Sequence, residues 1–266
     1  MKRLVVFISA LTLSVTCLAQ TLSFGIVPQQ SASRLAEQWT PIMNYLSEQT
    51  GIDVVFSTAP DIPTFEQRLA EGKYDIAYMN PYHYTVFSQT PGYRAIAKAK
   101  DKFIQGIIVA KKKDPIESLT QLNNSKLAFP SPAAFAATIL TQSDLNKAGI
   151  SYQVNYVSSH DSVYLGVAKG FYPAGGGVMR TFNSLPEVVK SQLKVIWRTE
   201  SYTPHAIATH PRLSQQQVSA LQKALMSLDS SSVGQAQLQT LSLKGFVAAQ
   251  DEDWNDVRKL NITILD

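Results

Sequence analysis

Residues 72–81 are Gly72-Lys73-Tyr74-Asp75-Ile76-Ala77-Tyr78-Met79-Asn80-Pro81, and they predict a short buried strand between two helices. The glycine ends the preceding helical segment. Tyr74 to Met79 is an almost continuous apolar run, which is typical of a strand covered on both faces. The Asn-Pro pair breaks the strand. Such a helix–strand–helix unit is the building block of an α/β sheet with helices on its faces.

Similar units lie on both sides of this stretch, which predicts an α/β fold with mainly parallel sheets. Ser33 is expected to cap a long helix that ends at Gly51, and Ser214 with Gln217 forms a capping box for another. Strands are expected at 22–27, 52–57, 74–79, 93–98, 104–110, 126–129, 152–157, 172–177, 193–199 and 203–209.

The order of these units predicts two lobes. Residues 20–110 and 111–199 each hold one complete series of strands and helices, whereas 205–266 has a strand and helices but no full sheet. We expect this tail to complete the first lobe. The chain would then cross between the lobes twice, near 108–111 and near 199–205.

Residues 1–19 have the layout of a secretory signal peptide: a basic start, an apolar middle and small residues at the end. A membrane anchor is the alternative, but the run is short for a spanning helix and holds four hydroxyl residues. Lipid attachment at Cys17 is a second alternative, although the residues before it fit that motif poorly. Cleavage would place the mature chain in the periplasm.

Composition excludes several classes of protein. Cys17 is the single cysteine, so a chain cleaved after Ala19 has neither disulfides nor thiolate metal sites. Its net charge falls from +4 to +2, because Lys2 and Arg3 leave with the signal peptide and no acidic residue precedes Gln20. A charge this small does not predict nucleic acid or an anionic membrane as a partner.

Three further segments carry a family resemblance together with residues 72–81: Phe24-Gly25-Ile26-Val27-Pro28-Gln29-Gln30, Ser158-Ser159-His160-Asp161 and Gly175-Gly176-Gly177-Val178. In this order and spacing the chain resembles the periplasmic phosphate/phosphite/phosphonate-binding proteins of ABC importers. The resemblance covers essentially the whole chain after residue 20. It implies a type II periplasmic-binding-protein fold, in which two lobes close on a ligand and deliver it to a membrane permease.

The junction Pro130-Ser131-Pro132-Ala133-Ala134 is a candidate anion site, because ligands of open α/β sheets bind where strands end and helices begin. We expect Ser131 to cap a helix over 133–148, with the amides of Ala133 and Ala134 facing a small anion. A plain, well-capped helix start is the alternative. The family's phosphonate binders carry a Ser/Thr-rich run here, so the Pro-Ala-Ala sequence leaves the identity of the ligand open.

Two other junctions supply neutral donors. His160 matches the family's ligand-contacting histidine, and its imidazole can donate to an oxyanion. A solvent-facing histidine in a capping segment is the alternative. Tyr78 and Asn80 end a buried strand and could line a polar cleft, with core packing as the alternative for Tyr78.

Arg180 follows the three glycines, which permit close approach of the backbone. The family's aminoethylphosphonate binders place an acidic residue near this position. An arginine there argues against an aminated ligand and permits a second negative charge. A surface arginine after a flexible loop is the alternative.

The sequence predicts a binding protein and no enzyme. It has no G-x-S-x-G, H-E-x-x-H or P-loop motif, and its four histidines are not at metal-ligand spacing. No metal or cofactor is therefore expected. We expect a monomer that captures a small oxyanion for an ABC permease, or alternatively one that presents its ligand to a membrane sensor kinase.

Overall fold

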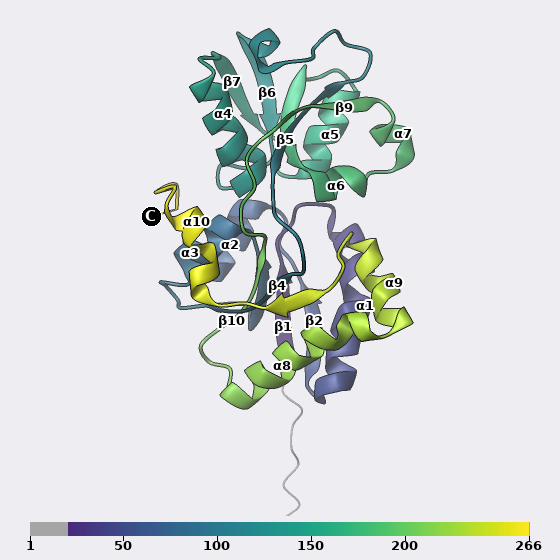
Figure 1. Cartoon of the computed structure of the whole chain (residues 1–266), viewed down its shortest axis with the longest axis vertical. Helices are drawn as coiled ribbons and strands as arrows, with labels where there is room; N and C mark the ends of the chain where they lie inside the picture. Colours follow the sequence, from purple (N-terminus) through teal and green to yellow (C-terminus); the bar gives the residue numbers. More distant parts are fainter. Residues whose placement is uncertain (1–20, 266) are drawn as a thin grey trace, which may run out of the picture.

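The computed structural model describes residues 21–265, which form two lobes joined by two extended segments (Figure 1). Each lobe is built on one sheet with helices on its faces, so the predicted α/β class is confirmed. The first sheet has the order β11-β4-β10-β3-β1-β2, and the second has the order β7-β6-β8-β5-β9. The strands are β1 (Thr21–Ile26), β2 (Asp53–Ser57), β3 (Ile76–Met79), β4 (Arg94–Ala99), β5 (Gly106–Lys111), β6 (Ser125–Phe129), β7 (Tyr152–Tyr156), β8 (Ala174–Val178), β9 (Leu193–Arg198), β10 (Ala206–Thr209) and β11 (Phe246–Ala248).

The helices are short except for α1 and α8. No helix within residues 21–265 is both long and apolar enough to cross a membrane. The predicted signal peptide, with Cys17, lies outside the described residues. The helical segments are α1 (Ala32–Thr50), α2 (Ile62–Ala70), α3 (Pro81–Phe87), η1 (Leu119–Leu122), η2 (Phe135–Leu140), α4 (Thr141–Lys147), α5 (His160–Ala168), α6 (Met179–Asn183), α7 (Glu187–Lys190), α8 (Gln215–Ser227), η3 (Leu228–Ser230), α9 (Ser232–Thr240), η4 (Asp251–Trp254) and α10 (Asn255–Arg258).

Both sheets are mixed, which corrects the expectation of mainly parallel sheets. β1 pairs in parallel with β2 and β3, whereas β10 runs antiparallel to β3 and β4. In the second sheet β6 pairs in parallel with β7 and β8, whereas β5 runs antiparallel to β8 and β9. The antiparallel strands β5 and β10 are those that follow the crossings between lobes. Each therefore starts at the edge where its two antiparallel neighbours end, and that edge faces the other lobe.

The first crossing lies earlier in the chain than the sequence predicted. β5 belongs to the second sheet, so residues 106–110 are not part of the first lobe and the crossing near 108–111 is wrong. The chain leaves β4 at Ala99 and enters β5 at Gly106. The apolar run of β5 is buried in either sheet, so its composition did not indicate which sheet it would join. The second crossing runs from Arg198 to Ala206.

Local sequence explains the helix α1. Its buried stripe is the predicted one, Leu35, Trp39, Ile42, Met43 and Leu46, and Gly51 ends it in the left-handed conformation. The cap is Ser31, whose Oγ accepts a hydrogen bond from the Arg34 amide, so the expected cap at Ser33 is wrong by two residues. The loop after β1 thus turns directly into α1.

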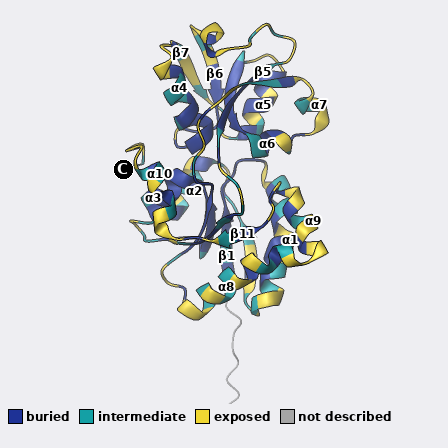
Figure 2. Cartoon of the chain, viewed as in Figure 1, coloured by how far each residue is buried: buried dark blue, intermediate teal, exposed yellow. Residues whose placement is uncertain are grey.

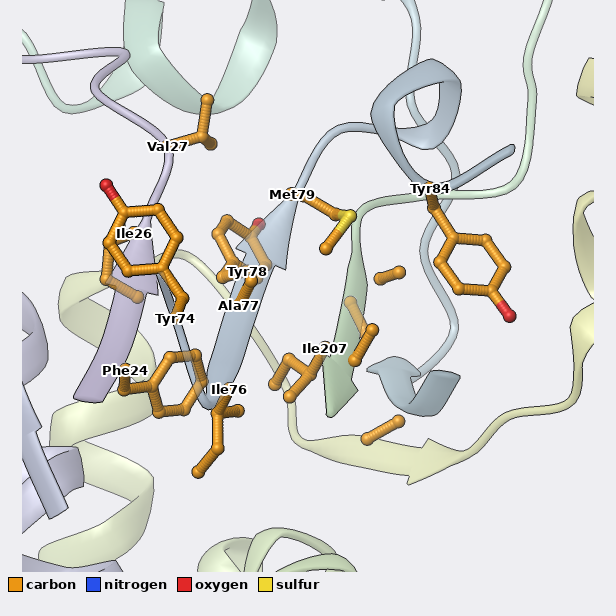
Figure 3. Packing of buried hydrophobic residues seen from close by; sticks show 14 of the residues in the cluster. Phe24, Ile26, Val27, Tyr74, Ile76, Ala77, Tyr78, Met79, Tyr84 and Ile207 are labelled. Atoms are coloured by element: carbon orange, nitrogen blue, oxygen red, sulfur yellow. The ribbon is translucent and has the colours of Figure 1, made fainter. Parts of the chain in front are cut away.

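The core of the first lobe lies between its sheet and the helices. Side chains of β1, β3 and β10 pack side by side, among them Phe24, Ile76 and Ile207 (Figure 3). The central strands of both lobes are buried, whereas the edge strands β2, β7 and β9 are partly exposed. Many exposed residues lie on the outer faces of the helices (Figure 2). Residues 133–137 of the second lobe belong to the same buried cluster as the first-lobe core. The two lobes are therefore closed on one another.

Candidate functional site

The junction after β6 does not form the helix start that the sequence predicted. Ser131 caps nothing, and the first six helical residues form the π-helix η2, with Ala134 at its N-cap. Thr138 and Ile139 both donate to the carbonyl oxygen of Ala134, at 2.7 and 3.3 Å. Just before this segment, the carbonyl oxygen of Ala133 accepts a hydrogen bond from the Asn80 side-chain amide of the other lobe, at 3.0 Å.

The amides that precede the first helical hydrogen bonds are those of Phe135, Ala136 and Ala137. With Ala134 they line a small cavity between the lobes, of about 10 Å³, whose other walls include Asn80 and His160. This is room for about one water molecule at most. Ser131 is 2% exposed, and its hydroxyl oxygen has no hydrogen-bond partner within residues 21–265. The amides without a helical partner at this junction are thus those of residues 135–137, and not those of Ala133 and Ala134 as expected.

His160 is buried at the lobe contact. It is 1% exposed, so the alternative of a solvent-facing histidine is wrong. Its backbone N–H donates across the cleft to the carbonyl oxygen of Gln29 at 3.1 Å. The ring Nδ1 lies 3.2 Å from Thr181 Oγ1, which leaves Nε2 as the nitrogen that can meet a ligand.

Tyr78 and Asn80 lie at the end of β3, on the wall opposite η2. The Asn80 side chain caps α3, because its Oδ1 accepts a hydrogen bond from the His83 backbone amide at 2.8 Å. Its Nδ2 donates to the carbonyl oxygen of Ala133. The Tyr78 ring packs on the Trp39 ring and stacks on the His205 ring, with distances between ring centroids of 4.6 and 4.8 Å. Figure 3 shows its ring on β3 beside the other core side chains. Tyr78 therefore serves both the core and the cleft.

Two residues at this site were not predicted, Gln29 and His205. The Arg180 guanidinium donates to Gln29 Oε1, and Gln29 Nε2 lies 3.2 Å from His205 Nε2. The position of Gln29 could have been found, because it follows the end of β1 as Asn80 follows β3. His205 could not, because it precedes β10, and only the antiparallel pairing of that strand brings it to the cleft.

Arg180, in the first turn of α6, is a charged group that acts on both histidines of the cleft. Its guanidinium lies 6.0 Å from the centre of the Tyr78 ring. Burial, with a further contribution from the Arg180 charge, lowers the pKa of His160 to about 3. The same two causes hold the pKa of His205 well below its usual range. Both imidazoles are therefore neutral at physiological pH.

The three glycines form the buried strand β8 rather than a flexible loop. Their role is packing. A Cβ added at Gly176 would lie 1.9 Å from the carbonyl oxygen of Ala137, and one at Gly177 would lie 2.2 Å from the Tyr164 hydroxyl. These glycines let η2 and α5 approach the two faces of the sheet. None of the three has a positive φ.

The site has no arrangement suited to a metal. Within residues 21–265 no group of three or more His, Cys, Asp or Glu side chains is placed to hold an ion. The donors that meet in the cleft are backbone amides, neutral imidazoles, a carboxamide and one guanidinium. Such a set suits the recognition of an oxyanion.

Known proteins share both the sequence pattern and the fold. The chain is 26% identical over 264 residues to the phosphonates-binding periplasmic protein of Escherichia coli, covering 91% of this chain and 76% of that protein. It is 21% identical over 234 residues to a phosphate-import protein of Mycolicibacterium smegmatis, covering 76% and 70% of the two chains.

Solved structures agree on the fold. A binding protein component of an ABC phosphonate transporter from Pseudomonas aeruginosa superposes with a TM-score of 0.84 at 20% identity, covering 91% of this chain and 86% of that one. PhnD1 from Prochlorococcus marinus in complex with methylphosphonate superposes with a TM-score of 0.83 at 20% identity, covering 91% of this chain and 99% of that one. Residues 24–254 match the family described as "ABC transporter, phosphonate, periplasmic substrate-binding protein". The chain therefore belongs to the family of periplasmic substrate-binding proteins of phosphonate ABC transporters.

Proposed function

We propose that this protein captures a small phosphorus oxyanion, such as a phosphonate, phosphite or phosphate, between its lobes and delivers it to the permease of an ABC importer. One observation carries the proposal: contacts from both lobes converge on the cavity ahead of η2. Two hydrogen bonds cross the cleft here. The Asn80 side-chain amide donates to the Ala133 carbonyl oxygen, and the His160 backbone amide donates to the Gln29 carbonyl oxygen. A ligand placed there would touch both lobes.

The relatives support this class of ligand. The Escherichia coli relative is named for phosphonates and the mycobacterial one for phosphate import, and the Prochlorococcus protein is described with methylphosphonate. The matched family is that of a transporter component, which favours a permease over a sensor kinase as the partner. Both lobes come from one chain, so we expect a monomer to bind its ligand.

The chemistry of capture follows from the donors. The amides of Phe135, Ala136 and Ala137 are aligned with the start of a helical segment that continues through α4, so the positive end of its dipole faces the anion. Neutral donors can hold an anion because each hydrogen bond to an ionised oxygen is charge-assisted. The cavity is smaller than a phosphonate. The lobes must separate to admit the ligand, and contacts to both lobes then favour closure.

The proposal is tested by calorimetry with phosphite, phosphate, methylphosphonate and sulfate. At least one phosphorus oxyanion should bind. His160→Ala should weaken its binding by about 1.5–3 kcal/mol, the range for a hydrogen bond to a charged group.

His210→Ala is the matched control. His210 follows β10 at the opposite end from His205, so its loss should leave ligand binding unchanged. Absence of binding by all three phosphorus oxyanions would contradict the proposed function. Equal binding by the His160 variant and the parent would show that the oxyanion lies elsewhere.

A further inference from the structure

A second cavity adjoins the one ahead of η2. It measures about 80 Å³ and lies where the chain crosses between lobes. The two cavities share three wall residues, Ile104, Val178 and His205. We call this second cavity the side chamber. The two cavities therefore lie next to each other.

Two cations line the side chamber, Arg180 from the second lobe and Lys102 from the first crossing. Both have neutral partners: the guanidinium donates to Gln29 Oε1, and Lys102 Nζ donates to the carbonyl oxygen of Ser242. Neither forms an ion pair within 4.0 Å with any carboxylate of residues 21–265. Partly buried cations without a counter-charge are costly, which indicates that an anionic group belongs beside them.

The neighbouring titratable groups do not neutralise these cations. His160 and His205 are uncharged, as shown above. Asp161 is close enough for the Arg180 charge to influence its pKa, but its carboxylate pairs with Arg34 at 3.6 Å, at the rim of the cleft. Burial and the Arg180 charge lower the pKa of Lys102. The side chamber thus holds excess positive charge.

The remaining walls are largely apolar. They include the side chains of Ala99, Phe103, Met179, Pro204 and Leu243. Apolar walls with two cations fit a short hydrocarbon segment that ends in an anionic group. A cationic substituent would meet repulsion there, and a purely apolar one would leave both cations unpaired.

We propose that the ligand is a phosphonate whose short substituent ends in a carboxylate or another anionic group. The phosphonate oxygens would lie ahead of η2, and the anionic end would lie between Arg180 and Lys102. This inference rests on the proposed function and defines its substrate class.

The test compares three ligands that differ in the charge of the substituent: phosphonoacetate, ethylphosphonate and aminomethylphosphonate. Calorimetry with the mature protein should show phosphonoacetate binding at least about tenfold more tightly than ethylphosphonate, as expected for one charge-assisted contact. Aminomethylphosphonate should bind most weakly of the three.

Substitutions at the two cations test whether they cause the preference for phosphonoacetate. Arg180→Gln should weaken phosphonoacetate about tenfold and ethylphosphonate less than about threefold. Lys102→Gln should act in the same direction, and Arg180→Lys should keep most of the preference. Lys100→Gln is the matched control. Lys100 pairs with Asp229 outside the side chamber, so this substitution removes one positive charge without changing the walls of the side chamber.

Each outcome separates this inference from the function on which it rests. If phosphonoacetate binds no more tightly than ethylphosphonate, the anionic-substituent proposal is overturned while phosphonate capture stands. If Arg180→Gln weakens both ligands equally, the arginine holds the phosphonate itself, and the proposal is again overturned. If no phosphonate, phosphite or phosphate binds, the proposed function fails. If Arg180→Gln does not fold, the order of ligand affinities in the parent and in Lys102→Gln tests the anionic-substituent proposal.

Discussion

The smallest unit that ties the lobes together is one side chain, Gln29. Its side-chain carboxamide contacts Arg180 on one side and His205 on the other, and the backbone carbonyl oxygen of the same residue accepts from the His160 amide. Both imidazoles are almost fully buried in this cluster, at 1% and 5% exposure. They are neutral because burial and the Arg180 charge disfavour their protonation. Proton binding by these two residues is therefore coupled to the integrity of the closed molecule.

This coupling predicts that the unliganded protein loses stability as the pH falls below about 6.5. The folded-state pKa values lie below the unfolded ones, so the unfolded chain binds more protons in that window. The stabilisation is present above pH 6.5 and is lost as the pH falls toward the folded pKa, which is about 3 for His160. Each histidine can contribute up to about 1.4 kcal/mol per pH unit.

The measurement is urea unfolding at pH 7.5, 6.5 and 5.5. The free energy of unfolding should fall less steeply in His160→Gln and His205→Gln than in the parent. Equal slopes in all three proteins would mean that the two histidines are protonated in the folded state as readily as in the unfolded chain.

At the scale of elements, β8 and β5 both pack closely against η2. Gly176 on β8 and Gly106 on β5 leave space for the carbonyl oxygens of Ala137 and Ala136, which a Cβ would approach to 1.9 and 2.1 Å. The sheet thus supports the irregular helix at the point where its amides face the cleft. The π-helix and the glycine-rich strand form one structural unit.

Gly176→Ala should therefore destabilise the protein by about 3 kcal/mol or more, because the added methyl meets backbone that cannot move without displacing η2. Chemical denaturation measures this. Gly166→Ala is the control, since its Cβ would meet only the edge of the Tyr172 ring at 2.9 Å, and alanine favours the helix α5. It should change stability by less than about 1 kcal/mol. Equal losses in the two variants would contradict this account of the glycines.

At the scale of the whole molecule, a second set of contacts closes the rim of the cleft. Gln30 Nε2 donates to Ser184 Oγ at 2.8 Å, and Arg34 Nη1 donates to the Ser184 carbonyl oxygen at 3.3 Å. The same guanidinium lies 3.6 Å from the Asp161 carboxylate. These contacts join the start of α1 to α5 and to the end of α6, far in sequence from the two crossings. They favour the closed arrangement.

Arg34→Ala should shift the unliganded protein toward an open form. Small-angle scattering should show a larger radius of gyration, and ligand affinity should fall about threefold, because partly exposed ion pairs contribute about 0.2–1 kcal/mol. Lys100→Ala removes an ion pair within the first lobe and is the control. An unchanged radius for Arg34→Ala would show that the rim contacts do not hold the lobes.

Much of the fold was determined by the sequence itself, because the signals are local. The stripe of α1, the capping box at Ser214 and the break at Asn80-Pro81 each depend on residues only a few positions apart. Strand ends and helix starts also predicted that Tyr78, Asn80, Ala134 and His160 lie near one another, and these residues do line the two neighbouring cavities between the lobes. Local patterns are sufficient for such features.

Only the tertiary structure decided which strands pair and which side chains meet across the cleft. Gln29 and His205 are 176 positions apart, and Gln29 and Arg180 are 151 apart. No local pattern encodes such pairs. β5 pairs with the glycine-rich strand β8 of the second sheet, and Ala133 beside Ser131 accepts a hydrogen bond from the Asn80 amide of the other lobe. Both contacts join residues that are far apart in the chain. Burial then made the histidines neutral, since desolvation depends on what surrounds a residue in space and not on its neighbours in the chain.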